Sequence, residues 1–215
     1  MKKKIILIHG YYKSKKDMSA LEKNLEELGN EVISVELPLT FEDITYATSV
    51  FEETVNEIIS GLKEGEKINL VGHSTGGIVI KLFLSNTEHI DKIHRCVLIA
   101  VPNRGSKLAD IASRLFPRSV NVFKTLKSLK CENVRKLQLK NIDSVEMGAI
   151  AGNKGNLLSD KLLKGKNDGR VEINSAICGE LKDFVVLPFN HAKIHHKFET
   201  AELVDAFLER GSFDL

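Results

Sequence analysis

Short apolar runs alternate along the chain with longer segments whose apolar residues recur every three or four positions. The first run, Lys4–Ile8, is apolar on both faces, which is typical of a buried strand in a parallel sheet. The same reasoning predicts five further strands at Glu31–Leu37, Lys67–Val71, Arg95–Val101, Val145–Ala151 and Phe184–Leu187. Strands separated by helices imply an α/β fold, with a mostly parallel sheet covered by helices on both faces.

Four main helices are expected between and after these strands, at residues 17–28, 43–61, 75–85 and 197–210. Each carries its apolar residues as a stripe, which indicates one buried face. A chain of 215 residues is long enough to bury a sizeable core, and we expect a single domain over residues 1–215.

The composition excludes several classes of protein. A formal net charge of +2 does not point to a nucleic-acid partner, and the apolar run after the three N-terminal lysines is too short for a secretory signal. No run approaches the roughly 20 apolar residues of a membrane-spanning helix, so we expect a cytoplasmic protein. Cys96, Cys131 and Cys178 are widely spaced, without a CxxC motif, which predicts structural thiols. No metal site and no cofactor are expected.

One interval interrupts the alternation. Between the fourth and fifth strands, residues 102–144 leave room for two or three extra helices, which we interpret as a cap insertion. We expect Leu115, Phe116, Val120 and Phe123 to line an entrance beneath it. From Asn103 to Lys140 there are ten Lys or Arg and two Asp or Glu, a net of +8. This charge indicates either a solvated face, an anionic substrate or an anionic membrane surface.

The segment Gly72-His73-Ser74-Thr75-Gly76 is a G-x-S-x-G motif. It follows a predicted strand and opens a predicted helix, which is the context required of a nucleophile elbow. Glycines two positions before and after the serine allow neighbouring backbone to pass close by. The motif therefore predicts that Ser74 is a nucleophile presented at the carboxyl end of the sheet.

A serine nucleophile needs a base, and the base needs a carboxylate that orients it. Asp168 lies in a polar turn after the fifth strand, and His191 follows the sixth, so both fall where catalytic side chains of this architecture gather. Asp160, in a segment typical of a short helix, is the rival acid. His195 and His196 are rival bases, although a solvated helix start explains them better.

An oxyanion hole requires two backbone donors aimed at the developing charge. We expect one from Thr75, directly after the nucleophile, and the other from Tyr11 in the loop after the first strand. His9, in the same loop, is interpreted as a structural hydrogen-bonding residue.

Together these motifs resemble the small bacterial lipases and esterases of the α/β-hydrolase superfamily. The matching segments are Ile8–Tyr11, Val71–Gly77, Pro102–Ser106, Asn167–Gly169 and His191. The resemblance covers essentially the whole chain and implies an α/β-hydrolase fold with a minimal sheet of about six strands, because the family's first two strands are absent. In Val101–Ser106, Val and Asn replace the Thr and His of the lipases' Thr-Pro-His-x-Gly-Ser stretch, which weakens any transfer of substrate preference.

The leading interpretation is hydrolysis of a carboxylic ester, with an ester or a lipid-like small molecule as substrate. Thioester or amide cleavage uses the same residues, and the ester reading rests on the fold. A different class is a catalytically silent fold member that binds a ligand or partner through its cap.

Overall fold

The computed structural model describes residues 2–137, 139–140, 142–177, 179 and 181–215. Its strands are β1 (Lys4–Ile8), β2 (Glu31–Val35), β3 (Ile68–His73), β4 (Ile93–Ile99), β5 (Glu146–Gly152) and β6 (Asp183–Leu187). They form a single sheet in the order β2-β1-β3-β4-β5-β6, and each neighbouring pair is parallel. The predicted six-stranded parallel sheet is confirmed.

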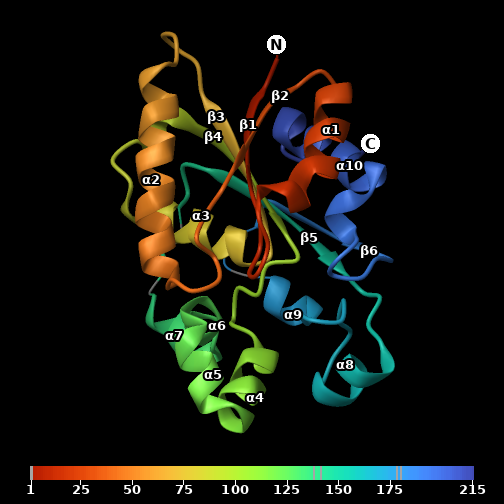
Figure 1. Cartoon of the computed structure of the whole chain (residues 1–215). Coiled ribbons are helices and arrows are strands. Elements are labelled where there is room, and N and C mark those ends of the chain that lie inside the picture. Colours follow the sequence, from red (N-terminus) through yellow and green to blue (C-terminus); the bar gives the residue numbers. More distant parts are fainter. Residues whose placement is uncertain (1, 138, 141, 178, 180) are drawn as a thin grey trace.

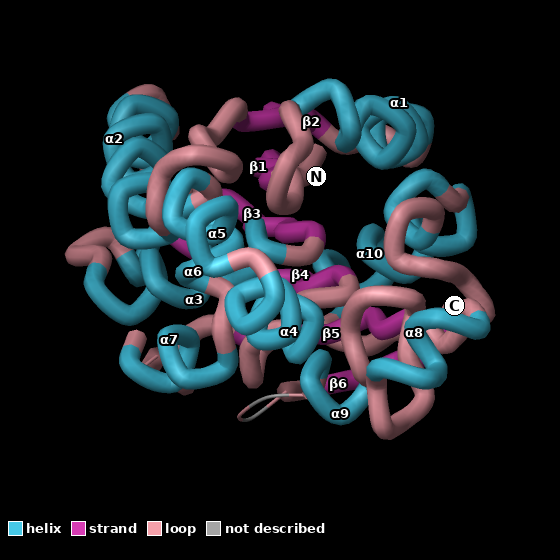
Figure 2. The backbone as a smooth tube through the Cα atoms, turned by 60° about the horizontal axis from the view of Figure 1, so that its bottom comes forward, coloured by secondary structure: helices cyan, strands magenta, loops and turns pink. Residues whose placement is uncertain are grey.

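The helices cover both faces of this sheet (Figures 1 and 2). They are α1 (Ser19–Glu27), α2 (Ile44–Ser60), α3 (Thr75–Asn86), α4 (Lys107–Leu115), α5 (Pro117–Val122), α6 (Lys124–Ser128), α7 (Cys131–Lys136), α8 (Leu157–Leu162), α9 (Ile173–Ala176) and α10 (Phe198–Arg210). Three short 3-10 helices join them, η1 (Lys15–Met18), η2 (Ile90–Lys92) and η3 (Ile194–His196).

Each face of the sheet has its own apolar core. On one face, α2 and α3 pack against the strands, and the rings of Phe51 and Phe83 meet edge to face with centroids 5.2 Å apart. On the other face, α1 and α10 pack together, and Leu25 and Phe207 belong to the same buried cluster. Because β3 and β4 lie at the centre of the sheet, the loops that follow them are held by packing on both sides.

The second strand ends two residues earlier than predicted. In the parallel register, Val35 faces Ile8, the last residue of β1, so the chain beyond Val35 has no strand to pair with. The Leu37 N–H instead donates to the ring of His9, at 3.1 Å from Nε2. His9 is fully buried, and its expected role as a structural hydrogen-bonding residue is confirmed.

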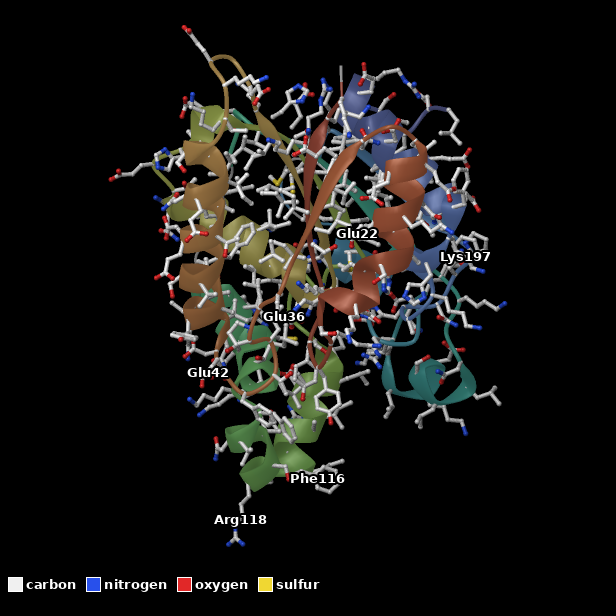
Figure 3. All side chains as sticks on the ribbon, turned by 45° about the horizontal axis from the view of Figure 1, so that its top comes forward. Glu22, Glu36, Glu42, Phe116, Arg118 and Lys197 are labelled. Atoms are coloured by element: carbon white, nitrogen blue, oxygen red, sulfur yellow. The ribbon has the colours of Figure 1, made fainter. Side chains whose placement is uncertain are left out.

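The interval between β4 and β5 contains four short helices, α4 to α7, one or two more than predicted. They lie at the carboxyl end of the sheet, as do α8 and α9 (Figure 1). The insertion is anchored to the start of α2, where the Thr125 hydroxyl donates to the carbonyl of Glu42. At its far tip, Phe116 and Arg118 point away from the rest of the chain (Figure 3).

The predicted structural thiols include Cys96, which is buried, and Cys131, which is partly buried, while Cys178 lies outside the described residues. No helix in the described part of the chain combines the length and the apolar character needed to cross a bilayer.

Candidate active site

The G-x-S-x-G segment forms a sharp turn between β3 and α3. Ser74 has φ 53° and ψ −123°, a backbone conformation that non-glycine residues rarely adopt and that the surrounding structure must hold in place. A Cβ atom on Gly76 would lie 2.6 Å from the carbonyl oxygens of Ile8 and His9, and one on Gly72 would lie 2.6 Å from the backbone nitrogen of Gly77. The predicted close passage of backbone at these glycines is confirmed.

The three side chains expected at the site lie in one chain of hydrogen bonds. His191 Nε2 lies 3.0 Å from Ser74 Oγ, and His191 Nδ1 lies 2.8 Å from Asp168 Oδ2. Asp168 and His191 are buried, whereas Ser74 is partly exposed. The serine hydroxyl can therefore receive a substrate while its partners are shielded from water.

The turn after β5 holds the Asp168 carboxylate firmly. Oδ1 accepts the N–H groups of Arg170 at 2.9 Å and Val171 at 2.8 Å, which leaves Oδ2 for His191. The His191 N–H in turn donates to the Asp168 carbonyl at 2.9 Å. Asp160, the rival acid in α8, instead accepts from the Asn167 side chain at 2.9 Å and so supports the turn.

The expected oxyanion donors lie on either side of Ser74. Thr75 is the first residue of α3, so its N–H has no acceptor within the helix. The Tyr11 N–H donates to no other described residue, whereas the next amide, that of Tyr12, donates to Leu39. At Gly10, which precedes Tyr11, a Cβ atom would lie 3.0 Å from the Ser74 Cβ, so this loop runs directly against the serine.

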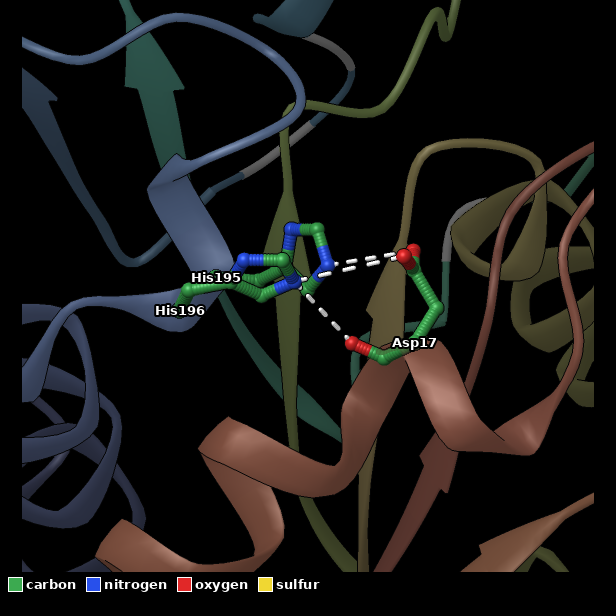
Figure 4. Close-up of side chains that lie close together, drawn as sticks. All are labelled: Asp17, His195 and His196. Carbon is green, nitrogen blue, oxygen red and sulfur yellow. Dashed lines mark hydrogen bonds and ion pairs between the residues drawn. The ribbon is translucent and has the colours of Figure 1, made fainter.

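A second histidine–carboxylate pair lies beside the first. His195 is fully buried, so the expectation that it belongs to a solvated helix start is wrong. Its Nε2 lies 3.1 Å from Asp17 Oδ2, and its ring stacks on that of His73 with centroids 3.8 Å apart. His196 is exposed, and its Nε2 lies 3.2 Å from the Asp17 carbonyl oxygen (Figure 4).

His73 connects this cluster to His191. Burial lowers the pKa of the His73 imidazole well below its usual range, and the neighbouring His195 and His191 rings add to the effect. His73 is therefore neutral near pH 7, and its Nε2–H can donate to the His191 carbonyl at 3.1 Å. Burial raises the pKa of Asp17, but hydrogen bonds from His195 and Lys13 outweigh burial and hold that pKa well below its usual range.

Asp17, His195 and His196 are also the residues that could hold a cation, because their ligand atoms lie within 4.8 Å of one another. Among the described residues no other such group occurs. The Lys13 ammonium already lies 3.0 Å from Asp17 Oδ1, so the carboxylate has a cationic partner from the chain itself.

Two hollows, one larger and one small, include Ser74 in their lining, and a second larger hollow shares Tyr11 and Arg170 with both. The first, of about 270 Å³, has a mostly apolar lining that includes Ser74, His191, Leu108, Ala112, Leu126 and Leu129. The second, of about 290 Å³, is lined by Tyr11, Tyr12, Lys13, Phe123 and Arg170. The small one lies between them, beside Ser74 and His191.

None of the four predicted entrance residues lines a hollow that includes Ser74. Phe123 lines the second hollow, but Leu115 and Phe116 are about two-thirds exposed, at 65% and 62%, and Val120 is buried. The stripe that includes Leu108 and Ala112 lines the hollow beside the serine instead, whereas Leu115, the last residue of α4, is exposed.

The fold is that of known lipases and esterases. The mature form of Bacillus licheniformis lipase BlEst2 superposes with a TM-score of 0.80 at 19% identity, over 97% of this chain and 91% of that one. The propeptide form of the same lipase superposes with a TM-score of 0.84 at 21% identity. The match covers 96% of this chain and 50% of the longer propeptide form. The metagenomic carboxyl esterase MGS0156 superposes with a TM-score of 0.76 at 16% identity, over 97% of this chain and 76% of that one. The predicted α/β-hydrolase fold is confirmed.

A search of curated proteins finds no match. The model of the DUF676 family, described as "Putative serine esterase", matches residues 1–110. That segment holds β1 to β4, the elbow with Ser74 and the loop with Tyr11. Since it makes up just over half of the chain, and the rest of the chain completes the same α/β-hydrolase fold, the chain belongs to the DUF676 family.

Proposed function

We propose that this esterase-family hydrolase cleaves carboxylic esters through an acyl-enzyme on Ser74. The observation that carries the proposal is the unbroken hydrogen-bond chain from Ser74 Oγ through His191 to Asp168, with links of 3.0 and 2.8 Å. At these distances His191 can take the proton of the Ser74 hydroxyl, and Asp168 can fix which ring nitrogen of His191 carries its proton. The family description and the shared fold with lipases and esterases support an ester as the substrate.

The first half of the reaction forms the acyl-enzyme. Ser74 Oγ attacks the ester carbonyl while His191 Nε2 takes its proton, and the carboxylate of Asp168 stabilises the resulting imidazolium. The N–H groups of Tyr11 and Thr75 donate to the negative oxygen of the tetrahedral intermediate. His191 then returns the proton to the alcohol oxygen as the carbon–oxygen bond breaks, and the alcohol leaves.

The second half repeats these steps with water in place of serine. His191 takes a proton from water, the hydroxide attacks the acyl carbon, and Ser74 Oγ leaves with the proton that His191 returns. The carboxylic acid is released, and the enzyme regains its starting state. Thioesters and amides would react at the same groups, with ester cleavage favoured by the family description.

A fluorophosphonate probe tests the proposal directly. We expect stoichiometric labelling of the folded protein, a matching loss of 4-nitrophenyl butyrate hydrolysis, and recovery of the adduct on a peptide that contains Ser74. A folded protein that neither reacts with the probe nor cleaves the ester would instead be the catalytically silent binding protein. Labelling at a different serine would also contradict the proposed role of Ser74.

We further propose that residues 1–215 form a single domain whose insertion, α4 to α7, acts as a cap over the acyl site. The apolar hollow of about 270 Å³ lies between this insertion and Ser74. It is slightly smaller than the roughly 300–1,000 Å³ of sites that enclose whole ligands. It therefore suits the acyl part of a substrate, with short and medium chains preferred over long ones.

Ala112→Phe should shorten the accepted acyl chain. The added ring enters the apolar hollow from α4 and displaces the far end of the chain, an effect of about tenfold or more in a hydrophobic pocket. The measurement is kcat/KM for 4-nitrophenyl acetate, butyrate and octanoate. The octanoate-to-acetate ratio should fall in Ala112→Phe and stay unchanged in Leu115→Phe, an exposed control on the same helix. An equal fall in both variants would refute this location of the acyl site.

A further inference from the structure

Arg170 lies two residues after Asp168, and the Asp168 carboxylate holds the backbone of Arg170 in place. The Arg170 N–H donates to Asp168 Oδ1 at 2.9 Å, so the backbone of this arginine cannot move without disturbing the chain that leads to Ser74. Its side chain is exposed. The backbone of Arg170 is thus fixed beside the site, while the nitrogen donors of its guanidinium group remain open to solvent and to a substrate.

Arg170 lines all three hollows, two of which include Ser74. It lines the apolar acyl hollow, the small hollow beside Ser74 and the hollow lined by Tyr12 and Phe123. Tyr11, the expected oxyanion donor, borders the same three. A carbonyl carbon at this junction would direct the acyl chain into the first hollow. The alcohol part would then extend toward Tyr12, Phe123 and Arg170.

The charge at this junction is positive. Within the described residues, the Arg170 guanidinium makes no ion pair, unlike Lys107 with Glu172 or Lys124 with Glu42. Lys13 lines two of the three hollows. Asp17 is the one described acidic residue that lines any of the three, and it is already bonded to Lys13 and His195.

The phenol of Tyr11 shows how close Arg170 lies. Burial raises the pKa of Tyr11, the neighbouring Tyr12 adds to that rise, and the positive charge of Arg170 opposes both. The guanidinium therefore acts on groups at the junction itself. Its planar set of five N–H donors suits a carboxylate or a phosphate, which it can bind through two parallel hydrogen bonds.

The basic insertion does not supply this contact. Lys124 is paired with Glu42, and Arg104, Lys107 and Arg135 line a separate hollow of about 650 Å³ that does not include Ser74. Arg118 lies at the far tip, pointing away (Figure 3). The cations that line the hollows with Ser74 are thus Arg170, from the segment between β5 and β6, and Lys13, from the loop after β1, both outside the insertion.

We propose that Arg170, assisted by Lys13, binds an anionic group on the alcohol part of the ester substrate. The group is a carboxylate or a phosphate, the two anions that the guanidinium fork matches. This inference rests on the proposed function, because it names the substrate class of the same site. It assigns the aromatic hollow of Tyr12 and Phe123 to the leaving group and the apolar hollow to the acyl chain.

The test compares aryl butyrates that differ in the charge of the leaving group. These are 4-carboxyphenyl butyrate, 4-(phosphonooxy)phenyl butyrate and the neutral 4-carbamoylphenyl butyrate, each assayed for kcat/KM. The readout is the anionic-to-neutral ratio, in which any general loss of activity cancels. We expect the ratio for at least one anion to fall about fivefold or more in Arg170→Gln, and less in Arg170→Lys, which keeps the charge. The better anion identifies the group.

Arg118→Gln and Arg104→Gln are the matched controls, since each removes one positive charge elsewhere on the protein. Their ratios should equal that of the parent. An unchanged ratio in Arg170→Gln for both anions overturns the proposal. An equal fall in the two controls also overturns it, because the preference would then come from the general field of the insertion.

A binding measurement separates this inference from the proposed function. In the Ser74→Ala background, 4-hydroxybenzoate and 4-hydroxyphenyl phosphate, the two leaving groups, are titrated by calorimetry without any turnover. At least one should bind about fivefold more weakly when Arg170→Gln is added. Equal binding with and without Arg170 refutes the anion site even if the esters are cleaved. Absence of ester cleavage with Arg170-dependent binding refutes only the proposed reaction.

Discussion

Ser74→Ala should reduce the kcat for 4-nitrophenyl butyrate by about 100,000-fold or more and abolish labelling by a fluorophosphonate. The reason is that Oγ forms the covalent bond to the acyl group, and no other described side chain shares its hydrogen bond to His191 Nε2. Alanine keeps the Cβ atom and the same backbone constraints, so the melting temperature should change little. The measurement is steady-state kinetics together with a thermal melt.

Ser60→Ala is the matched control, since Ser60 is an exposed serine at the end of α2. It should keep the full activity and labelling of the parent. Substantial hydrolysis by a folded Ser74→Ala protein would show that the reaction uses another nucleophile, and the proposed function would fail.

Asp168→Asn and His191→Ala should each lower kcat by about 10,000-fold, and the double variant should lose little more. These residues act as a unit with Ser74: His191 without Asp168 loses the partner of Nδ1–H, and Asp168 without His191 has no base to orient. The measurement is a double-mutant cycle on kcat, in which strong non-additivity is the expected signature.

Asp160→Asn is the control for the acid. Its side-chain oxygen can still accept from Asn167, so the turn that holds Asp168 should persist and activity should remain within a few-fold of the parent. If Asp160→Asn were the damaging change and Asp168→Asn the mild one, the roles of the two acids would have to be exchanged.

Local sequence patterns were sufficient for the parts of this fold that depend on neighbours along the chain. The pattern at Lys67–Val71 predicts a strand, which the structure has at Ile68–His73, and the glycines at 72 and 76 predict the tight turn around Ser74. The order of nucleophile, acid and base along the fold then selects Asp168 and His191 as partners, and the structure brings all three together.

Features that depend on distant partners could not be predicted in this way. A local pattern identifies His195 only as a polar residue, and the folded structure is needed to show that it is buried and that its ring meets Asp17, 178 positions away. The apolar stripe of the insertion is equally ambiguous. Periodicity identifies Leu108 and Leu115 alike, but only the packing of α4 in the structure shows that Leu108 lines the hollow beside Ser74 while Leu115 is exposed. The sequence likewise cannot show which positive charges of the insertion are paired with acidic residues elsewhere in the chain, as Lys124 is with Glu42.

The positions of β3 and β6 in the sheet have a consequence for how this protein would lose activity on heating. Ser74 follows a strand with neighbours on both sides, and its N–H is bonded to Ile99 of β4. His191 follows β6, an edge strand that pairs with β5 alone. Edge elements open locally at lower free energy than the centre of a sheet. With the roles proposed for His191 and Ser74, we expect thermal inactivation to begin with fraying of this edge and to precede cooperative melting of the core that holds Ser74.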